Sequence, residues 1–462
     1  MVHLLLVLMV SATLQAQSVN LIVKTEAHAD SLVVMPHQID SLLNRHLDVL
    51  WSQGYWNAKM VLESDGMDSQ TLIAHLERGS ITRIENIHFS GVTSRDEYYL
   101  VHELLMGKST IEVNNLVQAE NRIQDKGYLF EGHRSITKDL MGNYHAEYTI
   151  RKRPELNMDI LAAFNQPSGA DTVSWFGHVN LHVPNLDGRG KSIRLNWKRL
   201  KTNSEYFSFG YEHPWILNIP LTGQLKYGRE VVDGNYQVVV GTIGLAWNVS
   251  WERSLIFKYE DNQSLITQEG ALQNPEWQST RRGMFGVGYR QSNLDIINHT
   301  GLALLTTFDQ ELNFEPSSVS RFVLRSEFEY GIYSKLYLSQ RSAFVVQNET
   351  NAQNDPSLLV PLGGMNSVRG YSENLLRSLS VISLQHDFHL SLGLDSQLLA
   401  LIDIGAYYEE DSINYLTGYG VGVQLRSSRG PIRLILATHE GVALRNSFLH
   451  IEYSRGLSWI DQ

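Results

Sequence analysis

Hydrophobic and polar residues alternate with a period of two along most of the chain from about residue 155 onward. In the stretch SRFVLRSEFEYG, the aromatic residues Phe322, Phe328 and Tyr330 fall on one face, whereas Arg325 and Glu327 fall on the other. Successive side chains of a β-strand point to opposite sides, so this alternation predicts strands with one apolar and one polar face. The segments KSIRLNWKR, EYFSFGYE and QLLALIDIGAYY repeat the pattern. The last two-thirds of the chain are therefore expected to be all-β.

The first residues, MVHLLLVLMVSATLQAQ, form an apolar segment that ends in small and polar residues. It is shorter than the roughly 20 residues that a transmembrane helix requires. We interpret residues 1–16 as a secretory signal peptide that is cleaved after Ala16. The protein is therefore expected to be exported.

Strands of this kind suit two architectures. In a soluble protein the apolar faces pack on each other, whereas in a membrane β-barrel they meet lipid and the polar faces line the lumen. Sixteen strands can be placed between Glu155 and Tyr453, and an even number with a final strand near the C-terminus is usual for bacterial barrels. The export signal and the content of 21 Tyr and 9 Trp favour the barrel. We predict a mainly β fold with a sixteen-stranded transmembrane barrel at residues 154–462.

In the first third of the chain, two segments resemble each other, Leu42–Ser64 and Asn115–Thr137. Each begins as an amphipathic helix, breaks at a Gly-Tyr pair (Gly54-Tyr55 or Gly127-Tyr128) and continues as a strand. A glycine just after a helix is typical of a left-handed C-terminal cap. A further helix is expected at 95–105, and further strands at 19–24, 71–77, 82–91 and 144–153. The pattern predicts two β-α-α-β-β modules, at residues 17–79 and 80–153, and it resembles POTRA domains.

Composition argues against several other functions. The net charge of −11 disfavours nucleic acid as the main partner, because such a partner calls for a basic surface. The chain has no cysteine, so neither disulfides nor cysteine-based metal sites are available. No catalytic frame such as GxSxG occurs in the sequence. We expect no enzymatic activity, no metal and no cofactor.

The longest connection in the barrel region, from Asn348 to about Leu376, contains the stretch LGGMNSVRGYSEN. Together with VPNLDGRGKSIRL (183–195), FGYEHPWIL (209–217), LIDIGAYY (401–408) and GYGVGVQLRSSRGPIRLILA (418–437), it resembles the superfamily of POTRA-plus-barrel insertases and translocases. That superfamily, of the bacterial surface antigen type, includes the BamA insertases, TamA and the TpsB secretion pores. The resemblance covers nearly the whole mature chain, and it implies that the loop tip folds back into the lumen, where its arginine contacts the barrel wall. The tip residues are then Gly363, Gly364, Val368, Arg369, Gly370 and Tyr371.

Alternation along the neighbouring strands supplies partners for Arg369. Asp403 lies between apolar residues that point the other way, so it is expected to face the lumen and to form a bidentate pair with the arginine. The family often has a second wall carboxylate on the preceding strand, where this chain has Gln385. We expect Gln385 to accept a hydrogen bond from Arg369 without adding a charge, so the anchor is expected to be weaker than one with two acids. Asp387, which also faces inward, could substitute for Gln385.

Glycines on a later strand fit the same picture. Gly418, Gly420 and Gly422 all fall on the inward face of GYGVGVQLR. Strand glycines commonly mark the close approach of another backbone, so we expect these three to leave room for the loop.

The resemblance implies an outer-membrane protein assembly factor of a Gram-negative bacterium. Its POTRA-like domains would receive unfolded outer-membrane β-barrel polypeptides in the periplasm, because such domains add an extended strand to a sheet edge. The other expected partners are outer-membrane lipid and accessory assembly subunits. An open strand edge is a template for another strand, so the seam between the first and last barrel strands is expected to part and insert the client. The seam residues are Leu156, Met158, Ile160, Leu449, Ile451 and Tyr453.

Two other functions fit parts of the pattern. A TpsB-like secretion pore, which would translocate a polypeptide through the lumen, also carries two POTRA modules, although no plug helix is expected before the first module here. A passive porin would not explain the repeat. Because BamA generally has more than two POTRA modules, an accessory insertase is as plausible as the general one.

Overall fold

The computed structural model describes residues 19–24, 29–64, 71–125, 128–131, 134–152, 157–165, 174–201, 203–294, 300–312, 318–348, 355–393, 396–409, 412–427, 430–441 and 447–453. The signal peptide expected at residues 1–16 lies outside the described residues. By its internal contacts the chain divides into two units. Unit 1 comprises Met1–Gly91, Lys108–Asn121 and Phe130–Ile150, and unit 2 comprises Val92–Gly107, Arg122–Leu129 and Arg151–Gln462.

The first sheet, in unit 1, has four strands in the order β2-β1-β4-β3. Its segment contains β1 (Val19–Lys24), β2 (Ala29–Val34), the 3-10 helix η1 (Pro36–Gln38), α2 (Ile39–Ser52), β3 (Lys59–Ser64) and β4 (Thr71–Glu77). β1 pairs antiparallel with β2 and parallel with β4. The amphipathic helix α2 places Ile39 and Leu43 in one buried cluster with Leu21, Val34 and Ala74 of the sheet.

The structure confirms the strands predicted at 19–24 and 71–77 and the predicted end of the helix α2 just before Gly54. Gly54 follows that helix with a φ of +91°, the left-handed conformation that glycine adopts without strain. The expected helix after the first strand was wrong, because the chain forms strand β2 there. Val33 is 75% exposed whereas Val34 is buried, so this stretch follows the period of a strand rather than of a helix.

The second sheet has the order β6-β5-β9-β7, and β8 pairs with β9. Its segment contains β5 (Arg83–Ser90), α3 (Ser94–Leu105), β6 (Ile111–Glu112), η2 (Val113–Asn115), α4 (Leu116–Asp125), β7 (Tyr128–Phe130), β8 (Ser135–Lys138) and β9 (Tyr144–Lys152). The predicted strands at 82–91 and 144–153 and the helix at 95–105 agree with β5, β9 and α3 to within one residue at each end. Gly127, the second expected helix cap, lies outside the described residues.

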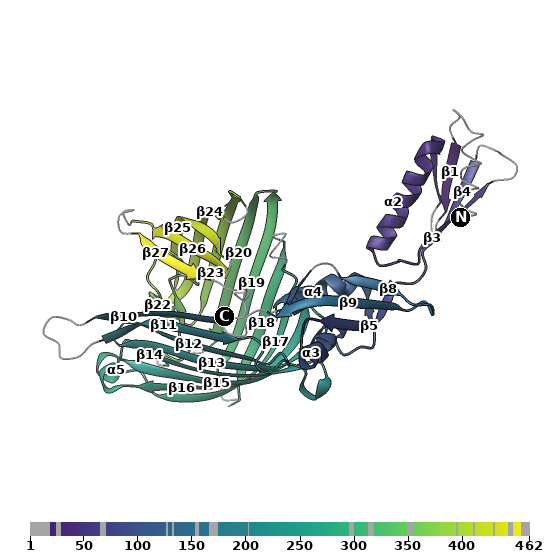
Figure 1. Cartoon of the computed structure of the whole chain (residues 1–462). Helices are drawn as coiled ribbons and strands as arrows, with labels where there is room; N and C mark the ends of the chain where they lie inside the picture. Colours follow the sequence, from purple (N-terminus) through teal and green to yellow (C-terminus); the bar gives the residue numbers. More distant parts are fainter. Residues whose placement is uncertain are drawn as a thin grey trace. The chain divides into compact units, whose positions relative to one another are not determined.

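Unit 2 contains a large antiparallel sheet, drawn in Figure 1 as a strongly curved surface. In the described part of the chain it has sixteen strands, in the order β10 to β20 followed by β23 to β27. They are β10 (Asn157–Asn165), β11 (Ser174–Val183), β12 (Ser192–Lys201), β13 (Ser204–His213), β14 (Leu221–Val232), β15 (Tyr236–Asn248), β16 (Arg253–Ile266), β17 (Thr280–Ser292), β18 (Gly301–Glu311), β19 (Ser320–Tyr333), β20 (Leu336–Asn348), β23 (Val381–Ser391), β24 (Ser396–Glu409), β25 (Ser412–Ser427), β26 (Gly430–His439) and β27 (Phe448–Tyr453). Short elements in the connections are η3 (Ile216–Asn218), α5 (Gln268–Gln273), β21 (Val360–Leu362) and β22 (Leu376–Ser378).

The two faces of this sheet differ in polarity. On one face large apolar side chains are exposed, among them Ile243 (62%), Trp247 (54%), Ile402 (53%) and Val421 (61%). The other face, called the inner face below, buries polar side chains that include Glu260, Asn262, Asp309, Glu327, Asp387 and Asp403. Buried charges need partners, and on this face Arg321 donates to both Glu260 and Asp309 at 2.9 Å. An apolar exterior with a polar interior is the division expected of membrane β-strands.

The two edge strands of the sheet have one neighbour each in the described part of the chain. β10 pairs with β11, and β27 pairs with β26. No helix in the described ranges is long and apolar enough to cross a membrane.

Candidate functional site

The connection between β20 and β23, called the long loop below, carries the stretch LGGMNSVRGY on a small hairpin of its own. β21 and β22 pair antiparallel, with Leu362 opposite Leu376. Gly363 and Gly364 follow with φ of +109° and +98°, a conformation that a side chain would strain. The Gly364 N–H then donates to the Val368 carbonyl at 3.0 Å, which closes the turn. The tip is thus a defined structure rather than an open surface turn.

Arg369 lies at this tip and is only 2% exposed. Its Nε donates to Asp403 Oδ2 at 2.7 Å and its Nη2 to Asp403 Oδ1 at 2.6 Å, which is a bidentate pair. The backbone N–H of Arg369 also donates to Asp403 Oδ2 at 2.8 Å. Asp403 is fully buried on the inner face of β24. The structure therefore brings together the two residues that the sequence pairs, and the bond from the backbone fixes the tip as well as the side chain.

The second side-chain partner of Arg369 is Asp387 and not Gln385, which the sequence had predicted. Arg369 Nη2 lies 2.6 Å from Asp387 Oδ1, so Asp387 supplies a second carboxylate from β23. The side-chain amide of Gln385 instead donates to the backbone carbonyl of Met365 at 2.9 Å. Gln385 therefore holds the loop through the loop's own backbone, at Met365, rather than through the Arg369 side chain. The expected weak anchor with one acid was wrong, because Arg369 contacts two acids.

The residues that flank the arginine pack on apolar and aromatic neighbours. Val368 is fully buried in a cluster with Leu362 of the hairpin and with Val345 and Val381 of the wall. Tyr371 stacks on His439 of β26, with ring centroids 4.2 Å apart. These contacts explain why a valine and an aromatic residue frame the cation.

Of the three glycines that were expected to leave room for the loop, one does so and two do not. A Cβ at Gly418 would lie 1.9 Å from the Arg369 carbonyl oxygen, so that glycine makes room for the tip. At Gly420 and Gly422 the nearest atoms belong to β26, namely Leu436 O and Leu434 O, so the expectation that they clear the loop was wrong. Gly405 of β24, which the sequence reading missed, does clear it, because a Cβ there would meet Val368 Cγ2 at 2.6 Å.

Comparison with known proteins agrees with this geometry. Residues 185–442, more than half of the chain, match the family model described as the Omp85 superfamily domain. The chain belongs to the Omp85 superfamily. That membership indicates a protein of the bacterial outer membrane that takes part in the insertion or translocation of polypeptides.

Several solved structures are similar to this chain at low sequence identity. CdiB from Escherichia coli is 12% identical with a TM-score of 0.57, covering 96% of this chain and 90% of that one. CdiB from Acinetobacter baumannii is 13% identical with a TM-score of 0.53, covering 91% and 81%. BamA from Haemophilus ducreyi lacking POTRA domains 1–3 is 15% identical with a TM-score of 0.47, covering 90% and 92%. No curated protein matches the chain in sequence.

The long loop of this Omp85 chain also contacts strands far from β23 and β24. Arg377 of β22 pairs with Glu230 of β14, and Lys198 of β12 lies 3.9 Å from Glu373. The sequence reading missed these pairs, because nothing in the alternation links positions so far apart. In the described ranges, no group of three or more His, Asp or Glu side chains is arranged to hold a metal ion.

The expected seam residues lie on the two edge strands as far as the structure describes them. Met158 and Ile160 belong to β10, and Leu449, Ile451 and Tyr453 belong to β27. Leu156 lies outside the described residues. The tip also touches this edge, because the Gly370 N–H donates to Nε2 of His450 on β27 at 3.4 Å.

Proposed function

We propose that this Omp85 protein inserts β-barrel proteins into the outer membrane. The two N-terminal modules are proposed to be periplasmic POTRA domains that receive the unfolded client, and the sheet of unit 2 is proposed to be a transmembrane barrel. The client's first strand then pairs with an edge of the seam between β10 and β27. The protein acts by strand pairing and carries out no enzymatic reaction.

One observation carries this proposal: among the described strands, β10 pairs only with β11 and β27 pairs only with β26. Each edge strand therefore offers backbone N–H and C=O groups to a further strand. Such edges are templates for pairing, and strand addition gives affinity with little demand on the client's sequence. The loop tip lies beside this edge through Gly370 and His450.

Cysteine crosslinking across the seam tests the proposal, and the chain has no native cysteine to interfere. Met158→Cys or Ile160→Cys on β10 is combined with Leu449→Cys or Ile451→Cys on β27. Oxidation is expected to stop the insertion of a client barrel into proteoliposomes, and reduction is expected to restore it. Full activity of the oxidised protein would refute insertion through the seam.

A matched control places the same bond where the strands already pair. Leu181 of β11 lies opposite Leu195 of β12, so Leu181→Cys with Leu195→Cys should crosslink without loss of insertion. The rival function, a TpsB-like secretion pore, works through the lumen with the seam closed. A locked seam that leaves polypeptide export intact would therefore favour the pore.

A further inference from the structure

The first described part of the long loop, from Asp355 to Leu358, contacts β17, a strand outside the set that holds the tip. Asp355 is 2% exposed, and its Oδ2 accepts a hydrogen bond from Arg282 Nε at 3.0 Å and another from the Thr280 hydroxyl. Both donors lie at the start of β17. Burial opposes the charge of Asp355, but hydrogen bonds from Thr280, Ser357 and Arg282 outweigh it, so the pKa of this carboxyl lies below its usual value.

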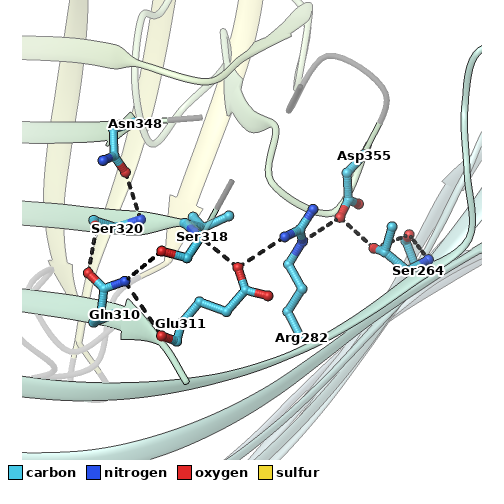
Figure 2. Close-up of polar contacts among 10 residues, drawn as sticks. Ser264, Arg282, Gln310, Glu311, Ser318, Ser320, Asn348 and Asp355 are labelled. Atoms are coloured by element: carbon cyan, nitrogen blue, oxygen red, sulfur yellow. Dashed lines mark hydrogen bonds and ion pairs between the residues drawn. The ribbon is translucent and has the colours of Figure 1, made fainter. Parts of the chain in front are cut away.

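Arg282 joins this carboxylate to a second connection, as Figure 2 shows. Its Nη1 donates to Glu311 Oε2 of β18 at 3.0 Å. The same oxygen accepts the backbone N–H of Val319, just before β19, at 2.9 Å. Arg282 thus stands between the long loop and the connection from β18 to β19.

The polar contacts continue to the residue where the long loop leaves the sheet. In Figure 2 the side chain of Gln310, next to Glu311, contacts Ser318 and Ser320. The backbone N–H of Ser320 donates to Oδ1 of Asn348, the last residue of β20, at 2.7 Å. The network therefore follows the ends of four adjacent strands, from β17 to β20, with Asp355 as its member from the loop.

Apolar contacts fix the same part of the loop. Leu358, 2% exposed, forms a buried cluster with Met284 of β17 and Val319, against which Leu379 packs. Gln347 of β20 donates to the carbonyl of Leu358 at 2.6 Å and to that of Leu379 at 3.2 Å. Without Leu358 and Leu379 packed over it, the Met284 side chain would be exposed to water on this polar face.

We propose that Asp355, Arg282 and Leu358 form a second anchor that holds the first part of the long loop independently of the tip. The tip anchor uses Asp387 and Asp403 on β23 and β24, whereas this second anchor uses β17 and β18, and the two share no residue. When the tip leaves its carboxylates, the loop stays attached to the wall. The free part of the loop is then shorter, so Arg369 has a higher effective concentration at its carboxylates than in a loop held only at its two ends. The inference goes beyond the proposed function, because a tethered loop serves an insertase and a secretion pore alike.

Two single-cysteine probes test the proposal in the full-length protein in detergent micelles or liposomes. Leu358→Cys reports on the second anchor, and Val368→Cys reports on the tip, because both side chains are at most 2% exposed. A maleimide labels either one only when its part of the loop opens. Asp355→Asn is expected to raise labelling at position 358 about tenfold or more, since it weakens buried charge-assisted bonds, and to leave position 368 protected. Asp403→Asn is expected to do the reverse.

Asp261→Asn is the matched control. Asp261 of β16 and Arg281 of β17 form a bidentate pair, at 3.0 and 2.8 Å, next to Arg282, but within the described residues the pair does not contact the loop. Asp261→Asn should leave the maleimide labelling rates at positions 358 and 368 unchanged. If Asp355→Asn prevents folding, Arg282→Lys, which keeps the charge and loses the forked geometry, gives the same readout and should open position 358 only.

Two results would overturn the proposal. One is unchanged labelling at position 358 in both Asp355→Asn and Arg282→Lys, which would mean that these residues hold nothing. The other is equal opening of both positions by Asp355→Asn and by Asp403→Asn, which would mean that the loop is held as one unit.

Discussion

The glycine beneath the loop tip gives the sharpest test of the site. Gly418 of β25 lies directly opposite Asp403 in the register of β24 and β25. In Gly418→Ala the new Cβ would lie 1.9 Å from the carbonyl oxygen of Arg369. A carbon and an oxygen without a covalent bond stay about 3.3 Å apart, so the tip or the strand must move by about 1.4 Å.

This displacement can be compared with the lengths of the hydrogen bonds that hold the tip. Arg369 contacts Asp403 through three hydrogen bonds of 2.6 to 2.8 Å. A shift of about 1.4 Å would take all three beyond hydrogen-bonding distance. Movement of the strand instead costs about 1–3 kcal/mol, as overpacking usually does. The cheaper of the two responses sets the cost, so the inserted tip loses about 1–3 kcal/mol, which corresponds to about 5–150-fold in its opening equilibrium.

The assay is maleimide labelling of Val368→Cys, which is fully buried in the inserted tip. Relative to Val368→Cys alone, added Gly418→Ala should raise the labelling rate by the factor just given. Gly241→Ala is the control, because a Cβ at Gly241 of β15 would meet nothing within 4 Å. Protection of position 368 in Gly418→Ala would refute the reasoning, and so would equal labelling in the Gly241→Ala control.

Other substitutions test the remaining contacts of the long loop. Asp403→Asn should lower the free energy of unfolding in urea, followed by gel mobility, by about 3–5 kcal/mol, because it leaves a buried guanidinium without its bidentate partner. Asp387→Asn should cost less, since Arg369 keeps all three of its hydrogen bonds to Asp403, and the reverse order would contradict the assignment. Arg377→Glu combined with Glu230→Arg should restore about 1–3 kcal/mol of what the single substitutions lose in the same assay, and simple additivity would count against the pair. Because the pKa of Asp355 is lowered in the folded protein, its contribution is present above the usual value of about 3.9 and is lost as the pH falls through the lower folded value. Amide exchange around Leu358, corrected for its intrinsic rate, should thus be the same at pH 5 and pH 7, and faster exchange already at pH 5 would contradict that lowered pKa.

The partners of Arg369 show what alternation can and cannot predict. Asp403 was predictable, because its neighbours Ile402 and Ile404 are apolar and side chains in a strand alternate between faces. Gln385 and Asp387 both face inward by the same rule, so alternation cannot choose between them. Gln385 is directly opposite Asp403 in the register, yet the arginine contacts Asp387, two residues further along β23 on the same face. That choice depends on how deep the tip inserts.

The second anchor shows the same limit over a longer distance. Alternation along the strand TRRGMFGVGYR predicts that the Arg282 side chain points inward. Met284 lies on the same face as Arg282, and Phe285 lies on the other face. Asp355, followed by Pro356, has the composition of a turn. No periodicity links a turn after β20 to β17, which lies three positions away from β20 in the sheet. Only the path of the loop across β18 and β19 brings the two charges together.

The contacts of the tip also bear on how the proposed seam between β10 and β27 would open without release of the loop. Among the described contacts, β27 contributes one hydrogen bond to the tip, from Gly370 to His450 at 3.4 Å, which is long for a strong bond. β23 and β24 contribute two carboxylates to Arg369, each at 2.6 Å. A neutral hydrogen bond contributes about 0.5–1.5 kcal/mol, less than the bonds to a buried charge. β27 can therefore move away at small cost to the tip, and the tip stays on the strands that do not border the seam.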